Sequence, residues 1–266
     1  MPNTTTSPIS YTVEHGVAAI RLDRPAASNA LDREMKMALL EALTAAGTDT
    51  AVRAVTITAT GKNFCVGQDL AEHVEGLRAD PSRAMDTVRD HYNPIVTALA
   101  SITVPVVVGI NGACVGAGLG LALAGDIRIA GTRAKFGTAF TGIGLASDSG
   151  LSATLTSLVG KSRASALFLL GESFTADKAQ NWGLVHEVAP DDEVSARTLA
   201  VATKLAAGPT AAYVAVKQLI TATADADLAE VLDLEAAAQQ KLGASVDHAA
   251  AVEAFLLKER PVFVGH

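Results

Sequence analysis

The sequence predicts an α/β fold followed by a C-terminal helical extension. Short apolar segments of strand length alternate with segments of helical periodicity over residues 10–190, which is typical of α/β proteins. Beyond residue 191 only helical patterns follow. The 266 residues are 49% hydrophobic and 4% aromatic, so we expect a large aliphatic core. Without an internal repeat or a low-complexity linker, the simplest organisation is one domain, with its core at 9–190 and a helical region at 191–266.

The elements can be placed in order from turn, cap and periodicity signals. Apolar residues alternate on both sides of the turn His15-Gly16, which predicts two short strands. Asp32 begins a helix whose apolar stripe starts at Met35, and residues 54–59 form the next strand. The remaining core elements are expected to be a helix at 82–101, strands at 104–110, 126–130 and 135–137, helices at 150–159, 163–170 and 176–182, and a strand at 184–188.

Residues 91–125 contain no Asp, Glu, Lys or Arg, so a membrane-spanning helix has to be considered. Such a helix needs about 20 consecutive, mostly apolar residues. Pro94, Pro105, Asn111 and the glycines between 109 and 120 interrupt this run. We therefore expect a helix end, a buried strand and a buried helix, and no membrane partner.

Charge and cysteine content exclude several classes of protein. The net charge of −7 argues against a nucleic-acid partner, which requires a basic face. Cys65 and Cys114 are too few for a disulfide framework and have no metal-ligand spacing, so we expect no metal and a cytoplasmic location. Residues 1–8 lack the features of a targeting signal and are expected to form a disordered tail.

Two glycine-rich loops have the character of an anion-binding site. The loops at 67–69 and 115–118 each precede a helical stretch, where the first backbone N–H groups have no partner inside the helix. Glycine also lets the main chain approach a ligand closely. Two such N–H groups could stabilise the oxygen of a thioester enolate, while tight packing alone is an alternative explanation. A dinucleotide fingerprint is excluded because Leu121 or Leu123 occupies its last glycine position.

The combination of these motifs resembles the crotonase (enoyl-CoA hydratase/isomerase) superfamily. The matching segments, in order, are L-D-R-P-A-A-S-N-A-L-D (22–32), N-F-C-V-G-Q-D-L (63–70), I-N-G-A-C-V-G-A-G-L-G-L-A-L-A-G-D-I (110–127), A-K-F-G (134–137), I-G-L (143–145) and A-x-x-W-G-L-V (179–185). The resemblance implies a spiral of β-β-α units with C-terminal helices, an acyl-CoA ligand and assembly into trimers or hexamers. It implies no cofactor beyond the coenzyme A of the substrate.

The same resemblance assigns roles to particular residues. The oxyanion donors would be the backbone N–H groups of Gln68 and Ala117. Lys258 would reach the nucleotide of an adjoining subunit. The residues expected to bind acyl-CoA are Arg24, Ala27, Val66, Gly67, Asp69, Leu70, Gly116, Phe140 and Lys258. Asp126 follows Gly125 and Asp69 follows Gly67-Gln68, each at an element boundary, so we also expect them to act as caps or buried hydrogen-bond partners.

The positions that correspond to catalytic glutamates in the hydratases of this superfamily are Gly120 and Phe140 here. Neither residue can transfer a proton. By the same resemblance, Asp148 falls where the Δ3,Δ2-enoyl-CoA isomerases carry a catalytic carboxylate. It also matches a P-D-[SA]-G-G segment of the ring-1,2-epoxyphenylacetyl-CoA isomerases, although Ser147 and Leu151 depart from that segment. A single carboxylate suits a 1,3-proton shift. The alternative role of Asp148 is that of an N-cap for the helix that follows.

The sequence thus favours an acyl-CoA isomerase in which Asp148 is the acid/base. An enoyl-CoA hydratase is the second hypothesis. A third hypothesis is an acyl-CoA-binding protein that kept the fold without the chemistry. His91 and Tyr92 lie where relatives cover the acyl pocket, but an ordinary core or surface role is the simpler explanation for both.

Overall fold

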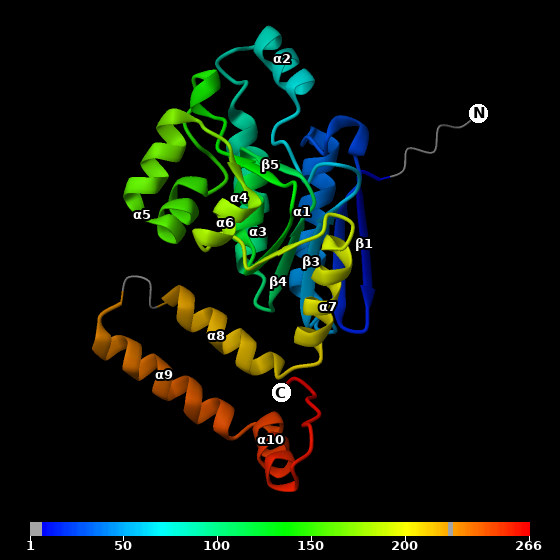
Figure 1. Ribbon diagram of the computed structural model, residues 1–266, viewed down its shortest axis with the longest axis vertical. Coiled ribbons are helices and arrows are strands. Elements are labelled where there is room, and N and C mark those ends of the chain that lie inside the picture. The colour runs from blue at the N-terminus through cyan, green and yellow to red at the C-terminus, as the bar shows by residue number, and fades with distance from the viewer. Residues whose placement is uncertain (1–6, 223–225) are drawn as a thin grey trace, which may run out of the picture.

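The computed structural model describes residues 7–222 and 226–266 (Figure 1). Most of the expected N-terminal tail, residues 1–6, lies outside the described residues. Its last residue, Pro8, is attached to the core, because its carbonyl accepts a hydrogen bond of 2.8 Å from the Asp23 N–H.

A six-stranded sheet forms the centre of the molecule, in the order β1-β2-β3-β4-β6-β9. Its strands are β1 (Ile9–Glu14), β2 (Val17–Leu22), β3 (Ala54–Ala59), β4 (Val106–Ile110), β6 (Ile127–Gly131) and β9 (Glu187–Ala189). Only the β1–β2 pair is antiparallel. A parallel sheet requires helices on both faces, which explains why all five residues of β4 are buried.

Helices cover both faces of this sheet. α1 (Arg33–Thr48) and α3 (Asn93–Ser101) pack together on one face, and α7 (Val194–Ala206) covers the other. Asp32 is the N-cap of α1 and accepts a 2.9 Å hydrogen bond from the Met35 N–H, as the sequence predicted. A π-helical segment, Val88–Tyr92, leads into α3. The helix α2 (Leu70–Ala79) lies at the edge of the molecule (Figure 1).

A second, three-stranded sheet carries the segments that will matter for function. It consists of β5 (Ala113–Val115), β7 (Lys135–Gly137) and β8 (Phe174–Thr175). Around it lie α4 (Ala117–Ala124), α5 (Leu151–Leu170) and α6 (Ala176–Asn181). Two short 3-10 turns, Pro25–Ala27 and Thr141–Ile143, contain no buried residue. Gly160 is non-helical inside α5, at the point where the sequence predicted a break between two helices.

The C-terminal helices extend away from the core at the end opposite α2 (Figure 1). They are α8 (Thr210–Ala222), α9 (Leu228–Gly243) and α10 (Val246–Leu257). Lys217 attaches α8 to the core, because its ammonium contacts the Asp126 carboxylate at 2.6 Å and the carbonyls of Ile102 and Val104. Asp126 also accepts from the Val106 N–H at 2.7 Å, which confirms its expected structural role.

Two predicted elements need correction. The helix expected from residue 82 begins only after residue 85, because the Asp80 carboxylate binds the backbone N–H and hydroxyl of Ser82 and stabilises a turn instead. The strand expected at 184–188 is displaced to Glu187–Ala189, since the N–H of Leu184 turns back to the Ala179 carbonyl.

The uncharged run at 91–125 is divided among α3, β4, β5 and α4, as expected for core segments. Within the described ranges, no single helix has the length and apolarity that a membrane crossing requires. The helices α7 and α8 meet that criterion only as a pair, which bends by 105°.

Candidate active site

The first glycine-rich loop, residues 67–69, is held by two backbone hydrogen bonds to Leu31. The Leu31 N–H donates to the Gly67 carbonyl at 2.7 Å, and the Asp69 N–H donates to the Leu31 carbonyl at 3.2 Å. Gly67 has φ +88°, a conformation that residues with a side chain rarely adopt. Because the C=O of Gly67 and the N–H of Gln68 belong to one trans peptide group and point in opposite directions, the Gln68 N–H faces away from Leu31.

The second loop leads from β5 into α4. Gly116 is the N-cap of α4, with φ 57° and ψ −125°, and its N–H donates to the Gly137 carbonyl at 3.0 Å. Ala117 is the first residue of the helix and is buried. A first helical residue has no acceptor within its own helix, and the helix dipole favours negative charge at this end.

A backbone bridge between Cys65 and Cys114 holds the two loops together. A Cβ atom added to Gly67 would lie 3.2 Å from the Val115 carbonyl oxygen and 3.4 Å from the Ala117 nitrogen, so the loops approach each other too closely for a side chain at this position to fit easily. Within the described part of the chain, neither the Gln68 N–H nor the Ala117 N–H has a hydrogen-bond acceptor. The structure therefore brings two free donors together, as the oxyanion hypothesis requires.

These donors border a mostly apolar cavity of roughly 190 Å³. It is lined by Val66, Gly67, Gln68, Leu70, His73, Met85, Thr87, Tyr92, Gly116, Ala117, Thr138, Ala139, Phe140, Ile143, Leu145 and Asp148. Eight of the residues selected from the sequence are among them. Apolar walls with a few convergent polar groups are typical of small-molecule sites.

Asp148 is partly buried at this cavity. Burial raises the pKa of its carboxyl, and a 2.8 Å hydrogen bond from the Ser149 hydroxyl opposes that rise. The capping alternative is wrong for this side chain. Gly150 is the N-cap of α5, no side chain caps that helix, and only the Asp148 backbone carbonyl accepts from Leu151.

The environment of Gly120 explains why it carries no side chain. A Cβ atom there would lie 2.7 Å from the Ser149 Cβ and 2.8 Å from the Ser149 carbonyl oxygen. The segment that carries Asp148 therefore fills the space beside Gly120. Phe140, at the other position compared with the hydratases, is buried and contributes its ring to the cavity wall.

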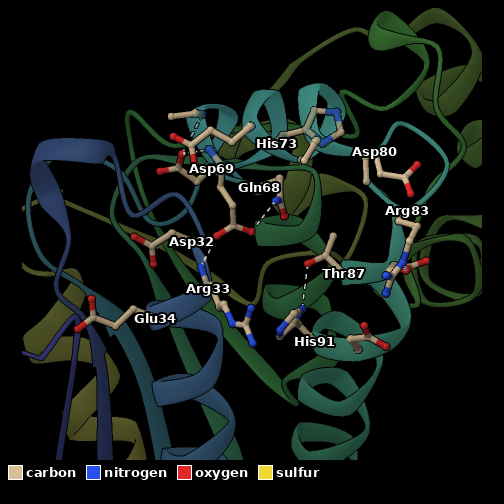
Figure 2. A pocket seen from close by; sticks show the side chains of 18 of the residues that line it. Asp32, Arg33, Glu34, Gln68, Asp69, His73, Asp80, Arg83, Thr87 and His91 are labelled. Carbon is tan, nitrogen blue, oxygen red and sulfur yellow. Dashed lines mark hydrogen bonds and ion pairs between the residues drawn. The ribbon is translucent and has the colours of Figure 1, made fainter.

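Arg24 and Asp69 lie in a wider charged cleft next to the cavity, which shares Gln68, His73 and Thr87 with it (Figure 2). Asp69 is the N-cap of α2, so its expected capping role is confirmed. Its ion pair with Arg24 has a length of 2.5 Å, and Arg24 also pairs with Asp32 at 3.1 Å. The Arg24 guanidinium is thus already neutralised within the protein.

Two residues selected for acyl-CoA binding line neither space. Ala27 lies on the 3-10 turn next to Arg24. That turn is held by Asn29, whose side chain accepts from the Arg24 N–H and donates to two carbonyls of the 60–63 segment. Lys258 ends α10, at the end of the molecule opposite α2, so a role at the nucleotide would require a second copy of the chain (Figure 1).

Tyr92 is a cavity residue that the sequence indicated only weakly. It was placed near the pocket only by resemblance, and its phenol is in fact buried against the oxyanion loop. Met85, Thr87 and Leu145 are further lining residues that no local pattern indicated. They reach the cavity through long-range packing, which no short sequence window contains.

Both cysteines are free and buried. Burial raises the pKa of the Cys65 thiol to about 12, and burial also raises the pKa of Cys114. Buried thiols of this kind are inert. Among the described residues, no group of three His, Cys, Asp or Glu side chains is placed to hold a metal ion.

Comparison with known proteins identifies the class to which this site belongs. Residues 12–266 match the family model described as enoyl-CoA hydratase/isomerase. A probable enoyl-CoA hydratase from Rhodobacter capsulatus is 40% identical over 258 residues, which cover 97% of this chain and 98% of that one. The 1,2-epoxyphenylacetyl-CoA isomerase of Escherichia coli is 38% identical, with 95% of this chain and 97% of that one covered.

A solved structure from Mycobacterium abscessus, described as an enoyl-CoA hydratase/isomerase, has a TM-score of 0.96 and 66% identity to this chain. The comparison covers 97% of this chain and 100% of that one. The chain therefore belongs to the enoyl-CoA hydratase/isomerase family and has the crotonase fold. Its chemistry is that of a hydratase or isomerase acting on acyl-CoA thioesters.

Proposed function

We propose that this enzyme is an acyl-CoA isomerase that shifts a proton, and with it a double bond, through a thioester enolate. The observation that carries the proposal is the composition of the cavity. Asp148 is its only carboxylate among the described residues, and it shares the cavity with both oxyanion loops. One acid and two aligned N–H donors suffice for a 1,3-proton shift.

In the proposed reaction the thioester oxygen accepts hydrogen bonds from the N–H groups of Gln68 and Ala117. The Asp148 carboxylate removes a proton from the α-carbon of a 3-enoyl thioester, and the electron pair of the broken C–H bond moves onto the thioester oxygen to give a dienolate. Each donor to this oxyanion is worth about 2.7–4 kcal/mol. The Asp148 carboxyl then donates a proton to the γ-carbon, which gives the conjugated 2-enoyl thioester; in the reverse direction it takes the proton from the γ-carbon and donates one to the α-carbon. Because the Asp148 carboxyl both takes up a proton and donates one, the reaction balances without a metal or a further cofactor.

The environment of Asp148 supports this role. A catalytic acid/base works best when its pKa approaches the working pH, and burial shifts the pKa of Asp148 in that direction. The ring of Phe140 excludes water from the cavity wall, which disfavours addition of water across the double bond.

An enoyl-CoA hydratase is the second candidate. It is favoured by the description of the Rhodobacter relative and by His73, a second proton-transfer group at the cavity. The absence of side-chain acids at Gly120 and Phe140 counts against it, since hydration requires one group to activate water and another to protonate the α-carbon.

Two substrates separate these candidates. With 3-hexenoyl-CoA, the isomerase should produce the ultraviolet absorption of a conjugated enoyl thioester, while crotonyl-CoA should keep its absorption. Asp148→Asn should reduce the isomerisation rate by about 10²-fold or more, whereas His73→Asn should retain most of it. Rapid loss of the crotonyl-CoA absorption would favour the hydratase. Binding of both thioesters without any turnover would favour a non-catalytic protein.

A further inference from the structure

The side chain of Gln68 is held at both ends, although the oxyanion hole needs only its backbone. Its Nε2 donates to the Glu72 carboxylate at 3.1 Å, and its Oε1 accepts from the Tyr92 hydroxyl. The direction of these bonds is determined by chemistry. An ionised carboxylate can only accept, so the amide nitrogen must face Glu72 and the Tyr92 hydroxyl must donate.

Glu72 is fixed in turn by a buried cation. The Lys36 side chain is fully buried, and its ammonium contacts the Glu72 carboxylate at 2.5 Å and the Thr87 hydroxyl at 2.8 Å. Glu72 also accepts from the Arg33 N–H at the start of α1. A buried charge persists only when it is paired and hydrogen-bonded, so this network is rigid.

Tyr92 belongs to the same network through its contacts with Gln68 and Lys36. Its side chain is 2% exposed, and the Lys36 ammonium lies 5.4 Å from the centre of its ring. Burial raises the pKa of its hydroxyl well above the usual range, so the hydroxyl stays a donor at every working pH. Tyr92 also lines the cavity with Asp148.

We propose that Tyr92 is a positioning residue. Its hydroxyl holds the Gln68 side chain against Glu72 and thereby aims the backbone N–H of Gln68 at the thioester oxygen. This inference rests on the proposed function only in that a thioester carbonyl occupies the oxyanion hole. On the other side, Leu31 restrains the same peptide through the backbone. The two restraints together leave the Gln68 N–H one orientation.

The test measures the bound carbonyl directly. Hexanoyl-CoA labelled with a heavy carbon isotope at its carbonyl is saturated, so it has no double bond to move or hydrate. Its carbonyl stretching frequency should fall on binding to the wild-type enzyme, because two N–H donors polarise the bond. In Tyr92→Phe, which keeps the ring over Lys36, the frequency should move part of the way back, while the affinity for hexanoyl-CoA changes less than about twofold.

Turnover and a second variant complete the test. In Tyr92→Phe, kcat for 3-hexenoyl-CoA should fall about tenfold at unchanged KM, less than the 10²–10³-fold lost when an oxyanion donor is removed. Gln68→Met keeps the backbone donor and should have the same effect. The double variant should be no worse than either single variant, because both remove one interaction. Tyr11→Phe, in β1, is the matched control.

An unchanged carbonyl frequency in Tyr92→Phe and Gln68→Met would overturn the positioning role. If Tyr92→Phe does not fold, Gln68→Met alone decides. If neither the wild-type enzyme nor any variant turns over 3-hexenoyl-CoA, the proposed function fails. The carbonyl frequencies of bound hexanoyl-CoA still decide the role of Tyr92 in that case.

Discussion

Asp148 lies where burial disfavours its ionised form and the Ser149 hydroxyl favours it. The net result is a raised pKa, which follows from the apolar surroundings of the cavity. A carboxylate that must accept a proton from carbon benefits from this, because its basicity increases. The same residue must still be ionised at the start of the reaction.

The pH dependence of the enzyme follows from that requirement. Only the ionised Asp148 can remove a proton, so kcat/KM should fall as the pH decreases through its pKa. Since the pKa is raised, this acid limb should lie above about pH 3.9, the ordinary value for aspartate. Ser149→Ala removes a hydrogen bond that lowers the pKa, so its limb should move to higher pH. An acid limb at or below the ordinary pKa of aspartate would contradict this account, as would an acid limb that stays at the same pH in Ser149→Ala.

At the scale of residues, the sequence analysis selected eight of the residues that line the cavity. Gln68, Ala117, Phe140 and Asp148 line one cavity, although their roles remain predictions. Whether Asp148 caps α5 could not be decided from the sequence, because an aspartate before a helix is equally compatible with a cap and with an active site. The positive φ values of Ser149 and Gly150 decided it, since they move the start of the helix past Asp148.

At the scale of elements, the meeting of α4 with the turn before α5 sets the shape of the site. Gly120 lets α4 approach Ser149 closely, and that approach places Asp148 at the cavity. The sequence indicated α4 and the glycine but not this contact. The contact between Gly120 and Ser149 arises from packing of two segments about thirty residues apart, which local periodicity does not encode.

Gly120→Ala should therefore destabilise the protein and impair catalysis together. The added methyl group would overlap Ser149, and overpacking of this kind costs about 1–3 kcal/mol, more than the gain in helix propensity. Urea unfolding and the rate with 3-hexenoyl-CoA measure the two effects. Gly142→Ala is the control, because nothing lies within 4 Å of the added atom there. Equal stability and activity in Gly120→Ala and wild type would refute the packing argument.

Most strands were predicted at or near their observed bounds because buried apolar segments between turns are a strong local signal. The segment after α2 was less predictable. Its turn at Asp80 and its π-helical segment depend on a side-chain cap and on the packing of Tyr92 beneath the oxyanion loop. The latter involves partners that are distant in sequence.

At the scale of the whole molecule, the C-terminal helices leave large apolar side chains uncovered. On α8–α10 these are Val216, Ile220, Leu228, Leu232, Leu234, Val246, Val252, Phe255, Leu256 and Leu257. Apolar surface of this extent marks an interaction site in a globular protein. We propose that a second copy of the chain covers it, as the expected trimer or hexamer requires, and that Lys258 then approaches the nucleotide of its neighbour.

Light scattering after size-exclusion chromatography tests this assembly. The wild-type protein should have the mass of a trimer or hexamer. Phe255, with 81% of its surface exposed, should be essential to the contact, so Phe255→Asp should shift the mass toward the monomer. Met37→Asp likewise replaces an exposed apolar side chain by a carboxylate, but on α1, and it should leave the mass unaltered. A monomeric wild-type protein would rule out the proposed assembly.

The central claim, that Asp148 moves protons on a bound thioester, is tested most directly by hydrogen exchange into the substrate. In heavy water, the wild-type enzyme should introduce deuterium at the α- or γ-carbon of 3-hexenoyl-CoA, read by mass spectrometry. Asp148→Asn should slow this by about 10²-fold or more while still binding the thioester. Equally fast exchange in wild type and Asp148→Asn would contradict the account.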